Sequence, residues 1–273
     1  MIEIGRMHTL SVERIDERGA TLLLEDQPVL LPRNELSPQM KTGDELTVFV
    51  YRGRQDVLVA TFKRPLAMAG EFALLRVSQA NKFGAFLDWG LDKELMVPFA
   101  EQPERMKVGR DYIVHVGLDN SGRLVGSARI ERYLEQDEVD LCPGQEVDVL
   151  IWQFTDLGAK VIINNRFGGL IYRDDLPAGV KRGETGKAYV MRVREDNLVD
   201  ITPRKVGKAG LDEARQVVFE ALQQEGRLPL TDKSSPEEIE QLLGLSKKAF
   251  KRAVGTLYRE RLIELADGEI RLV

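Results

Sequence analysis

A threefold repeat of glycines constrains the fold of this chain more than any other feature. In each copy a second glycine follows the first by 14 residues, and a third follows the first by 38 or 39 residues. The three sets are Gly5, Gly19 and Gly43; Gly70, Gly84 and Gly109; and Gly144, Gly158 and Gly183. A further fixed position, 27 or 28 residues after the first glycine, holds Pro32, Pro98 and Tyr172. The spacing indicates three copies of one structural unit of about 60–70 residues.

Each copy has the composition of short β-strands. Apolar runs follow the second glycine at residues 20–24, 85–89 and 159–163, and follow the third at 46–50, 112–116 and 188–193. In the middle copy Ala85, Leu87 and Trp89 alternate with Phe86 and Asp88, which is the period of a strand with one buried face. Short, evenly spaced strands whose glycines mark bends or bulges predict one small β-barrel per copy.

The pattern changes after residue 206, where helical periodicity replaces the strand signal. One helix is expected over residues 211–224, and a second begins at Ser235-Pro236, with Glu238 completing a capping box, and ends near Leu243. A turn at 244–246 leads to a third helix that ends near Arg261. Two apolar runs then flank Asp267-Gly268, which is typical of a hairpin. This order predicts a winged helix-turn-helix domain.

The fold class expected is therefore mostly β and multidomain, with three barrels followed by one α+β domain. We place the domain boundaries at 1–65, 66–134, 135–206 and 207–273. The acidic stretch at 135–140 and the glycine-rich stretch at 207–210 are interpreted as linkers.

Charge and composition narrow the expected partners and location. The net charge is −5, and none of the four expected domains is net positive, so any nucleic-acid binding must rest on local cations and base stacking. The chain has one cysteine, Cys142, and shows neither a signal peptide nor a long apolar stretch. We therefore expect a cytoplasmic protein without a membrane partner.

The motifs around the second glycine resemble those of a known domain. Residues 82–87 and 95–98, within 70–130, resemble an S1-type RNA-binding domain, which is an OB-fold barrel. Residues 157–159 and 169–176 carry a similar motif, and 18–20 and 31–36 carry its most degenerate copy. Three S1-type domains followed by a winged helix resemble the CvfB family of bacterial virulence regulators over almost the whole chain. This resemblance implies RNA binding and post-transcriptional regulation of gene expression, and no known reaction.

The resemblance also implies a binding face, with aromatic residues beside the second glycine and a histidine or aromatic residue at the Pro32, Pro98 and Tyr172 position. Only the middle copy has both aromatic residues beside its second glycine. The candidate contacts for single-stranded RNA are stacking or cationic side chains near these positions. They are Lys82, Phe83, Phe86, Lys160, Arg166, Tyr172 and Arg173. The alternatives are that the phenylalanines pack against a neighbouring domain and that Tyr172 belongs to a core.

The third helix of the C-terminal domain carries a basic stripe. Phe250, Ala253, Val254 and Leu257 cluster on one side at 100° per residue, and the cations lie on the other. The candidate nucleic-acid contacts there are Lys248, Lys251, Arg252 and Arg259. The alternatives are a solvated basic face and a protein-binding surface.

No catalytic or metal-binding pattern is visible, so we expect no enzyme, no cofactor and no metal site. His8 and His115 belong to different copies, and neither has the spacing of a metal ligand. The favoured function is an RNA-binding post-transcriptional regulator. Two alternatives stay open: a DNA-binding transcription regulator that uses the winged helix, and a scaffold that docks on the ribosome or polymerase.

Overall fold

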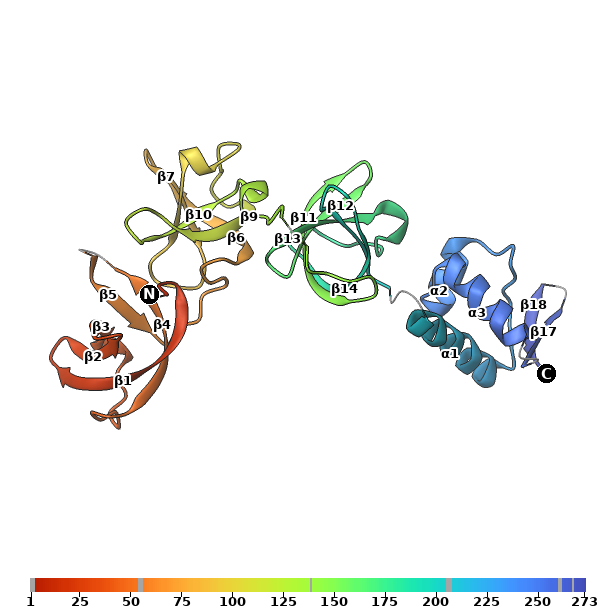
Figure 1. Ribbon diagram of the computed structural model, residues 1–273, viewed down its shortest axis with the longest axis horizontal. Coiled ribbons are helices and arrows are strands. Elements are labelled where there is room, and N and C mark those ends of the chain that lie inside the picture. The colour runs from red at the N-terminus through yellow and green to blue at the C-terminus, as the bar shows by residue number, and fades with distance from the viewer. Residues whose placement is uncertain (1–2, 54–55, 138, 205–207, 260–261, 267) are drawn as a thin grey trace. The chain divides into compact units, whose positions relative to one another are not determined.

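The computed structural model describes residues 3–53, 56–137, 139–204, 208–259, 262–266 and 268–273, with the backbone alone over 208–212. The chain divides into two compact units, 1–134 and 135–273. The first unit holds two β-barrels, and the second holds a third barrel and a C-terminal helical domain (Figure 1).

Each barrel is closed and has five strands in the same order: first, second, third, fifth, fourth. Barrel 1 consists of β1 (Arg6–Asp16), β2 (Gly19–Leu24), β3 (Gln27–Pro32), β4 (Glu45–Arg52) and β5 (Leu58–Thr61). Barrel 2 consists of β6 (Phe72–Ala80), β7 (Gly84–Asp88), β8 (Leu95–Pro98), β9 (Asp111–Leu118) and β10 (Leu124–Ser127). Barrel 3 consists of β11 (Glu146–Thr155), β12 (Gly158–Ile163), β13 (Phe167–Tyr172), β14 (Thr185–Val193) and β15 (Val199–Thr202). The expected fold class, three small barrels in a mostly β chain, is confirmed.

Short 3-10 helices complete the barrels. One follows the third strand of each barrel, as η1 (Arg33–Glu35), η3 (Phe99–Glu101) and η5 (Arg173–Asp175), and η4 (Ile130–Arg132) follows barrel 2. Third and fifth strands pair in parallel, for example Leu170 of β13 with Asp200 of β15, and the other neighbouring strands pair antiparallel. The third strand thus lies between the second and the fifth, and these three strands form one continuous outer surface.

Strand alternation separates the core of each barrel from this outer surface. Ala85, Leu87 and Trp89 are at most 2% exposed, as the sequence period predicted, and they pack in the core of barrel 2. Phe86 points the other way and is partly exposed. The residues that alternate with core residues on the second, third and fifth strands are therefore the ones available to a ligand.

The second glycine of the repeat is required by a close backbone approach. A Cβ on Gly84 would lie 2.3 Å from the Val97 carbonyl oxygen, and on Gly19 or Gly158 it would lie 2.0 Å from the carbonyl opposite. The repeat glycines were expected to mark bends or bulges, and the bulges do not fall at these glycines. The register shifts fall in the first strand of each barrel, between Val12 and Arg14, Val77 and Gln79, and Ile151 and Gln153.

The C-terminal domain has the expected order of elements. It consists of α1 (Lys208–Glu225), β16 (Arg227–Leu228), α2 (Pro236–Leu243), α3 (Lys247–Arg259), β17 (Ile263–Ala266) and β18 (Glu269–Leu272). Ser235 caps α2, and Glu238 closes the capping box. The three strands form a sheet in the order β16-β18-β17, against which the helices bury one core that includes Val218, Phe250 and Ile270. The winged helix prediction is confirmed.

Two expected linkers are not linkers in the described part of the chain. The Glu135 amide bonds the Arg166 carbonyl at 2.8 Å, and Leu141 lies in the core of barrel 3, so residues 135–140, apart from the undescribed 138, pack on that barrel. Residues 208–210 form the first turn of α1, and 207 lies outside the described residues. The third helix ends at Arg259, and residues 260–261 are likewise not described. Among the described helices, none is long and apolar enough to cross a membrane.

Candidate nucleic-acid interface

The outer surface of barrel 3 gathers aromatic and cationic side chains around one bulge. β11 has one extra residue at Trp152, between Ile151, which pairs with Val161, and Gln153, which pairs with Lys160. The bulge brings the Trp152 ring to the outer face, where the Lys160 amino nitrogen lies 5.3 Å from its centre. Both side chains are partly exposed. An aromatic plane with a cation beside it can stack a base and hold a phosphate.

The same surface continues across three further strands. Lys160 pairs with Leu170, Leu170 with Asp200, and Asp200 with Arg192. The positions that correspond to Asp200 hold Val59 in barrel 1 and Val125 in barrel 2. The charged part of the surface is therefore a property of barrel 3.

Asp200 organises two arginines at this surface. Its side chain is 2% exposed and accepts hydrogen bonds from Arg192 Nε at 2.6 Å and from Arg194 Nε at 2.8 Å. Burial raises the pKa of Asp200, but the bonds from the two arginines outweigh it and hold the pKa below its usual value. Arg194 also donates to the Tyr172 hydroxyl at 2.9 Å. The two guanidinium groups are thereby held near the Tyr172 ring. The two arginines and the Asp200 carboxylate together carry one net positive charge.

Of the other candidate residues of barrel 3, Tyr172 and Arg173 lie at one end of β13 and Arg166 lies at the other. Tyr172 is partly exposed beside Arg194, and Arg173 follows it, exposed, at the start of η5. Arg166 precedes β13, whereas Tyr172 ends it, so the two are separated by the full length of that strand, about 20 Å at about 3.3 Å per residue. Arg166 also forms ion pairs with Glu135 and Asp140, and its guanidinium lies over the Phe167 ring. The expectation that Arg166 lies near Tyr172 was wrong, because its guanidinium is held by carboxylates at the far end of the strand.

Barrel 2 presents its two phenylalanines on one hairpin. Phe83 stands at the tip between β6 and β7, is 59% exposed, and has the Lys82 amino nitrogen 5.1 Å from its ring centre. Asn81 fixes this tip, since its side-chain oxygen accepts the Phe83 amide at 2.8 Å and its own amide bonds the Gly84 carbonyl. Phe86 lies in β7 on the outer face, paired with Met96 on β8. The site offers two aromatic rings and one cation.

A carboxylate limits the charge of this face. Glu94 accepts a hydrogen bond from the Gln79 amide, and the single hydroxyl hydrogen of Ser78 is shared between the Glu94 carboxylate and the Phe86 carbonyl, which lies 2.8 Å from the hydroxyl oxygen. A negative group beside Phe86 disfavours a phosphate there. Barrel 2 is therefore suited to stacking more than to phosphate binding. The matching surface of barrel 1 holds Thr21, Leu30, Val59 and Tyr51, and the Tyr51 ring packs against the apolar cluster of barrel 2.

The basic stripe of the winged helix is exposed as expected. Phe250, Ala253 and Leu257 are buried in the domain core, and the opposite side of α3 exposes its cations. These are Lys248, Lys251, Arg252 and Arg259. Arg259 folds back on its own helix, bonding the Gly255 carbonyl and the Thr256 hydroxyl. Tyr258, 53% exposed, lies beside the stripe and was not anticipated.

The titratable groups do not gather into a metal site in the described part of the chain, where no group of three or more potential ligands occurs. His115 stacks on Tyr133, with ring centres 4.0 Å apart, and its Nδ1 is buried with no hydrogen-bond partner among the described residues. Burial lowers the pKa of His115 from 6.5 to about 4. The imidazole is therefore neutral at neutral pH.

Sequence reasoning missed Trp152, Arg192, Arg194 and Asp200. Trp152 sits on a bulge, so strand alternation alone assigns it to no face. Asp200 differs from its apolar counterparts, and a charged residue in the last strand of only one repeat was the available signal. The arginines stand at a second shift of register, between Val190 and Arg192.

Comparison with known protein families finds a match for each of the two domain types. A model of the S1 domain matches residues 4–63, and a model of the CvfB-like winged helix domain matches residues 216–272. The chain is 25% identical to Conserved virulence factor B of Staphylococcus aureus strain N315 over 98% of this chain and 94% of that protein. It is 26% identical to the protein of the same name from Staphylococcus epidermidis, with the same coverage. A solved structure described as a multidomain protein with nucleic acid binding domains, from Streptococcus pneumoniae, covers 99% of this chain at 24% identity and a TM-score of 0.42.

The barrels and the C-terminal domain define the class of protein. Five-stranded barrels in the OB order that end in a winged helix make this a multidomain S1/winged-helix protein, built from two domain types that bind nucleic acids elsewhere. Within that class, the resemblance to the CvfB family is confirmed by the match of the CvfB-like winged helix model and by the full-length similarity to Conserved virulence factor B.

Proposed function

We propose that this protein binds single-stranded RNA on the outer faces of barrels 2 and 3, with a second contact from the winged helix, and that it regulates gene expression after transcription. The observation that carries the proposal is the surface of barrel 3. There Trp152, Lys160 and Tyr172 offer two aromatic rings and a cation beside the two arginines that Asp200 holds. Single strands are bound by such combinations of stacking and phosphate contacts.

Single strands fit this surface better than a duplex does. The aromatic rings lie on the curved outside of a small barrel and need unstacked bases as partners. Each barrel offers few cations, and the chain is net negative, so each site alone binds modestly. Linking the sites in one chain raises the overall affinity through effective concentration. No catalytic step is part of the proposal.

A second candidate function rests on α3. Its exposed cations lie on one helical face, which is the arrangement that recognition helices present to a duplex. A DNA-binding regulator would use this face and leave the barrels free for another role. Glu237 and Glu238, at the start of α2, add negative charge close to that helix in the same domain.

The test is fluorescence anisotropy of the full chain with labelled single-stranded RNA, single-stranded DNA and duplex DNA at two salt concentrations. We expect the highest affinity for single-stranded RNA. A Phe83→Ala/Phe86→Ala variant and a Trp152→Ala variant should each weaken it. Binding of duplex DNA alone, abolished by Lys248→Ala/Arg252→Ala, would favour the DNA-binding regulator. Absence of binding to all three would favour a scaffold that docks on other proteins.

A further inference from the structure

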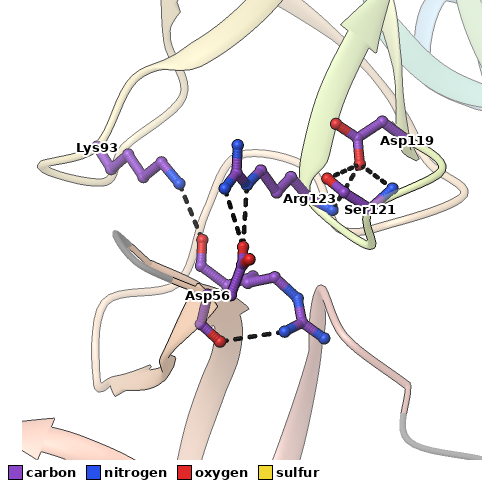
Figure 2. Close-up of polar contacts among 6 residues, drawn as sticks. Asp56, Lys93, Asp119, Ser121 and Arg123 are labelled. Atoms are coloured by element: carbon purple, nitrogen blue, oxygen red, sulfur yellow. Dashed lines mark hydrogen bonds and ion pairs between the residues drawn. The ribbon is translucent and has the colours of Figure 1, made fainter.

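Two loops of barrel 2 contact Asp56 and the end of β4 in barrel 1, within the first unit. Asp56, in the loop between β4 and β5, accepts hydrogen bonds from Arg123 Nε at 3.3 Å and Nη2 at 2.9 Å (Figure 2). The Lys93 amino group donates to the Arg52 carbonyl at 2.8 Å. The Arg123–Asp56 pair joins residues 67 positions apart in sequence.

Arg123 is positioned by its own turn. Asp119 accepts hydrogen bonds from the Ser121 amide at 2.8 Å, the Ser121 hydroxyl at 2.6 Å and the Arg123 amide at 2.9 Å (Figure 2). These bonds fix the turn between β9 and β10 whether or not Asp56 is present. The Arg123 guanidinium is therefore presented by barrel 2 alone, and Asp56 is its partner rather than its support.

Strand alternation puts Arg123 on the side of the aromatic face. Val125 of β10 pairs with Met96, which pairs with Phe86, so these three residues form one row on the outer surface. Leu124 packs toward the core of barrel 2. Arg123, two residues before Val125, thus leaves the strand on the same side as Val125. It is a cation beside this row, directly before β10.

The pair with Asp56 is easily exchanged. The side chains of Arg123 and Asp56 are 48% and 58% exposed, and exposed ion pairs contribute little to stability. A phosphate matches the planar guanidinium as well as a carboxylate does. The barrels themselves stay joined, because Phe49 of barrel 1 is buried against Trp89 of barrel 2, with ring centres 5.9 Å apart, and the Ala69 amide bonds the Gly5 carbonyl.

We propose that Asp56 is an intramolecular competitor that occupies Arg123 until a phosphate of a bound single strand replaces it. The ion pair between Arg123 and Asp56 is then the RNA-free state, in which the Arg123 guanidinium is occupied by the carboxylate and does not bind a phosphate. Binding of RNA then transfers Arg123 from the Asp56 carboxylate to a phosphate of the RNA. This inference rests on the proposed function, since it needs RNA on the face of barrel 2.

The test compares Asp56→Asn, Arg123→Gln and the double variant in the full chain, by anisotropy with labelled oligouridine at several salt concentrations. Asp56→Asn should tighten binding about two- to fivefold, the range expected for release of an exposed ion pair. Arg123→Gln should weaken binding and lower the slope of log affinity against log salt by about 0.7, one phosphate contact on a single strand. The double variant should match Arg123→Gln alone.

Asp92→Asn is the matched control. Asp92 pairs with Lys63 at 2.6 Å, so this variant makes the same change of charge at another ion pair between the two barrels. It should leave affinity within the error of the wild type. Equal tightening by Asp92→Asn, or tightening by Asp56→Asn that persists with Arg123→Gln, would show general charge repulsion and overturn the proposal. No tightening in a wild-type chain that binds RNA would refute the competition alone, whereas no binding by the wild type would refute the proposed function as well.

Discussion

Replacing Trp152 with alanine should weaken RNA binding through the loss of one stacking platform. The ring lies on the outer face of barrel 3, with Lys160 over it, and its neighbour Ile151 fills the core instead. Truncation therefore removes a contact surface without opening the barrel. Stacking of one base on an aromatic ring contributes about 1–3 kcal/mol, which corresponds to an affinity loss of about 5- to 150-fold.

The assay is anisotropy of the full chain with labelled single-stranded RNA, with thermal unfolding measured alongside. Phe154→Ala is the matched control, because Phe154 is 45% exposed on the same strand but pairs with Ala159, on the opposite side from Lys160. Its affinity should stay within about twofold of the wild type, below the loss of one stacked base. Wild-type affinity for Trp152→Ala, or an equal loss for Phe154→Ala, would refute the assignment of the outer face.

Three further perturbations test the stability and the second contact. Asp200→Asn should destabilise barrel 3 by about 1–3 kcal/mol in urea unfolding followed at Trp152, since two arginines lose a buried ionised acceptor; unchanged stability would show that the cluster is not structural. The His115 pKa of about 4 lies below its unfolded value of 6.5, so the unfolded chain binds the proton more readily and stability falls as pH drops from 6.5 toward 4. NMR titration should show this low pKa, His115→Phe should remove that part of the pH dependence, and a pKa near 6.5 would contradict it. Lys248→Ala/Arg252→Ala should lower the salt slope of RNA binding by about 0.7 per lost phosphate contact, whereas Lys233→Ala, elsewhere in the winged helix domain, should not; equal slopes in all three chains would exclude a contact by α3.

The barrels were predictable because their constraint is local and repeated. The second glycine recurs where a Cβ would strike the carbonyl opposite, at 2.3 Å for Gly84, so the spacing records the hairpin geometry of each copy. The C-terminal domain was predictable for a similar reason, because the capping box of Ser235 and Glu238 marks the start of α2 within four residues of sequence.

The candidate site was less predictable, because the residues that pair in it lie far apart in the sequence or stand at a bulge. Arg166 looked available in the sequence, but Glu135 and Asp140, which neutralise it, lie 31 and 26 positions away. Trp152 takes its face from a shift of register that no strand period reveals. The partnership of Arg123 with Asp56 depends on how two barrels pack, which single-strand patterns do not encode.

Intrinsic tryptophan fluorescence gives the most direct test of RNA binding on the outer face of barrel 3. The chain has two tryptophans, and they report on different places. Trp89 is 2% exposed in the core of barrel 2, with its indole nitrogen bonded to the Lys93 carbonyl, whereas Trp152 stands on the proposed interface. Single-stranded RNA should quench the wild-type emission with the same midpoint as the anisotropy change, and Trp152→Phe should abolish the quenching while binding persists. RNA binding without quenching, or quenching that survives Trp152→Phe, would contradict the account.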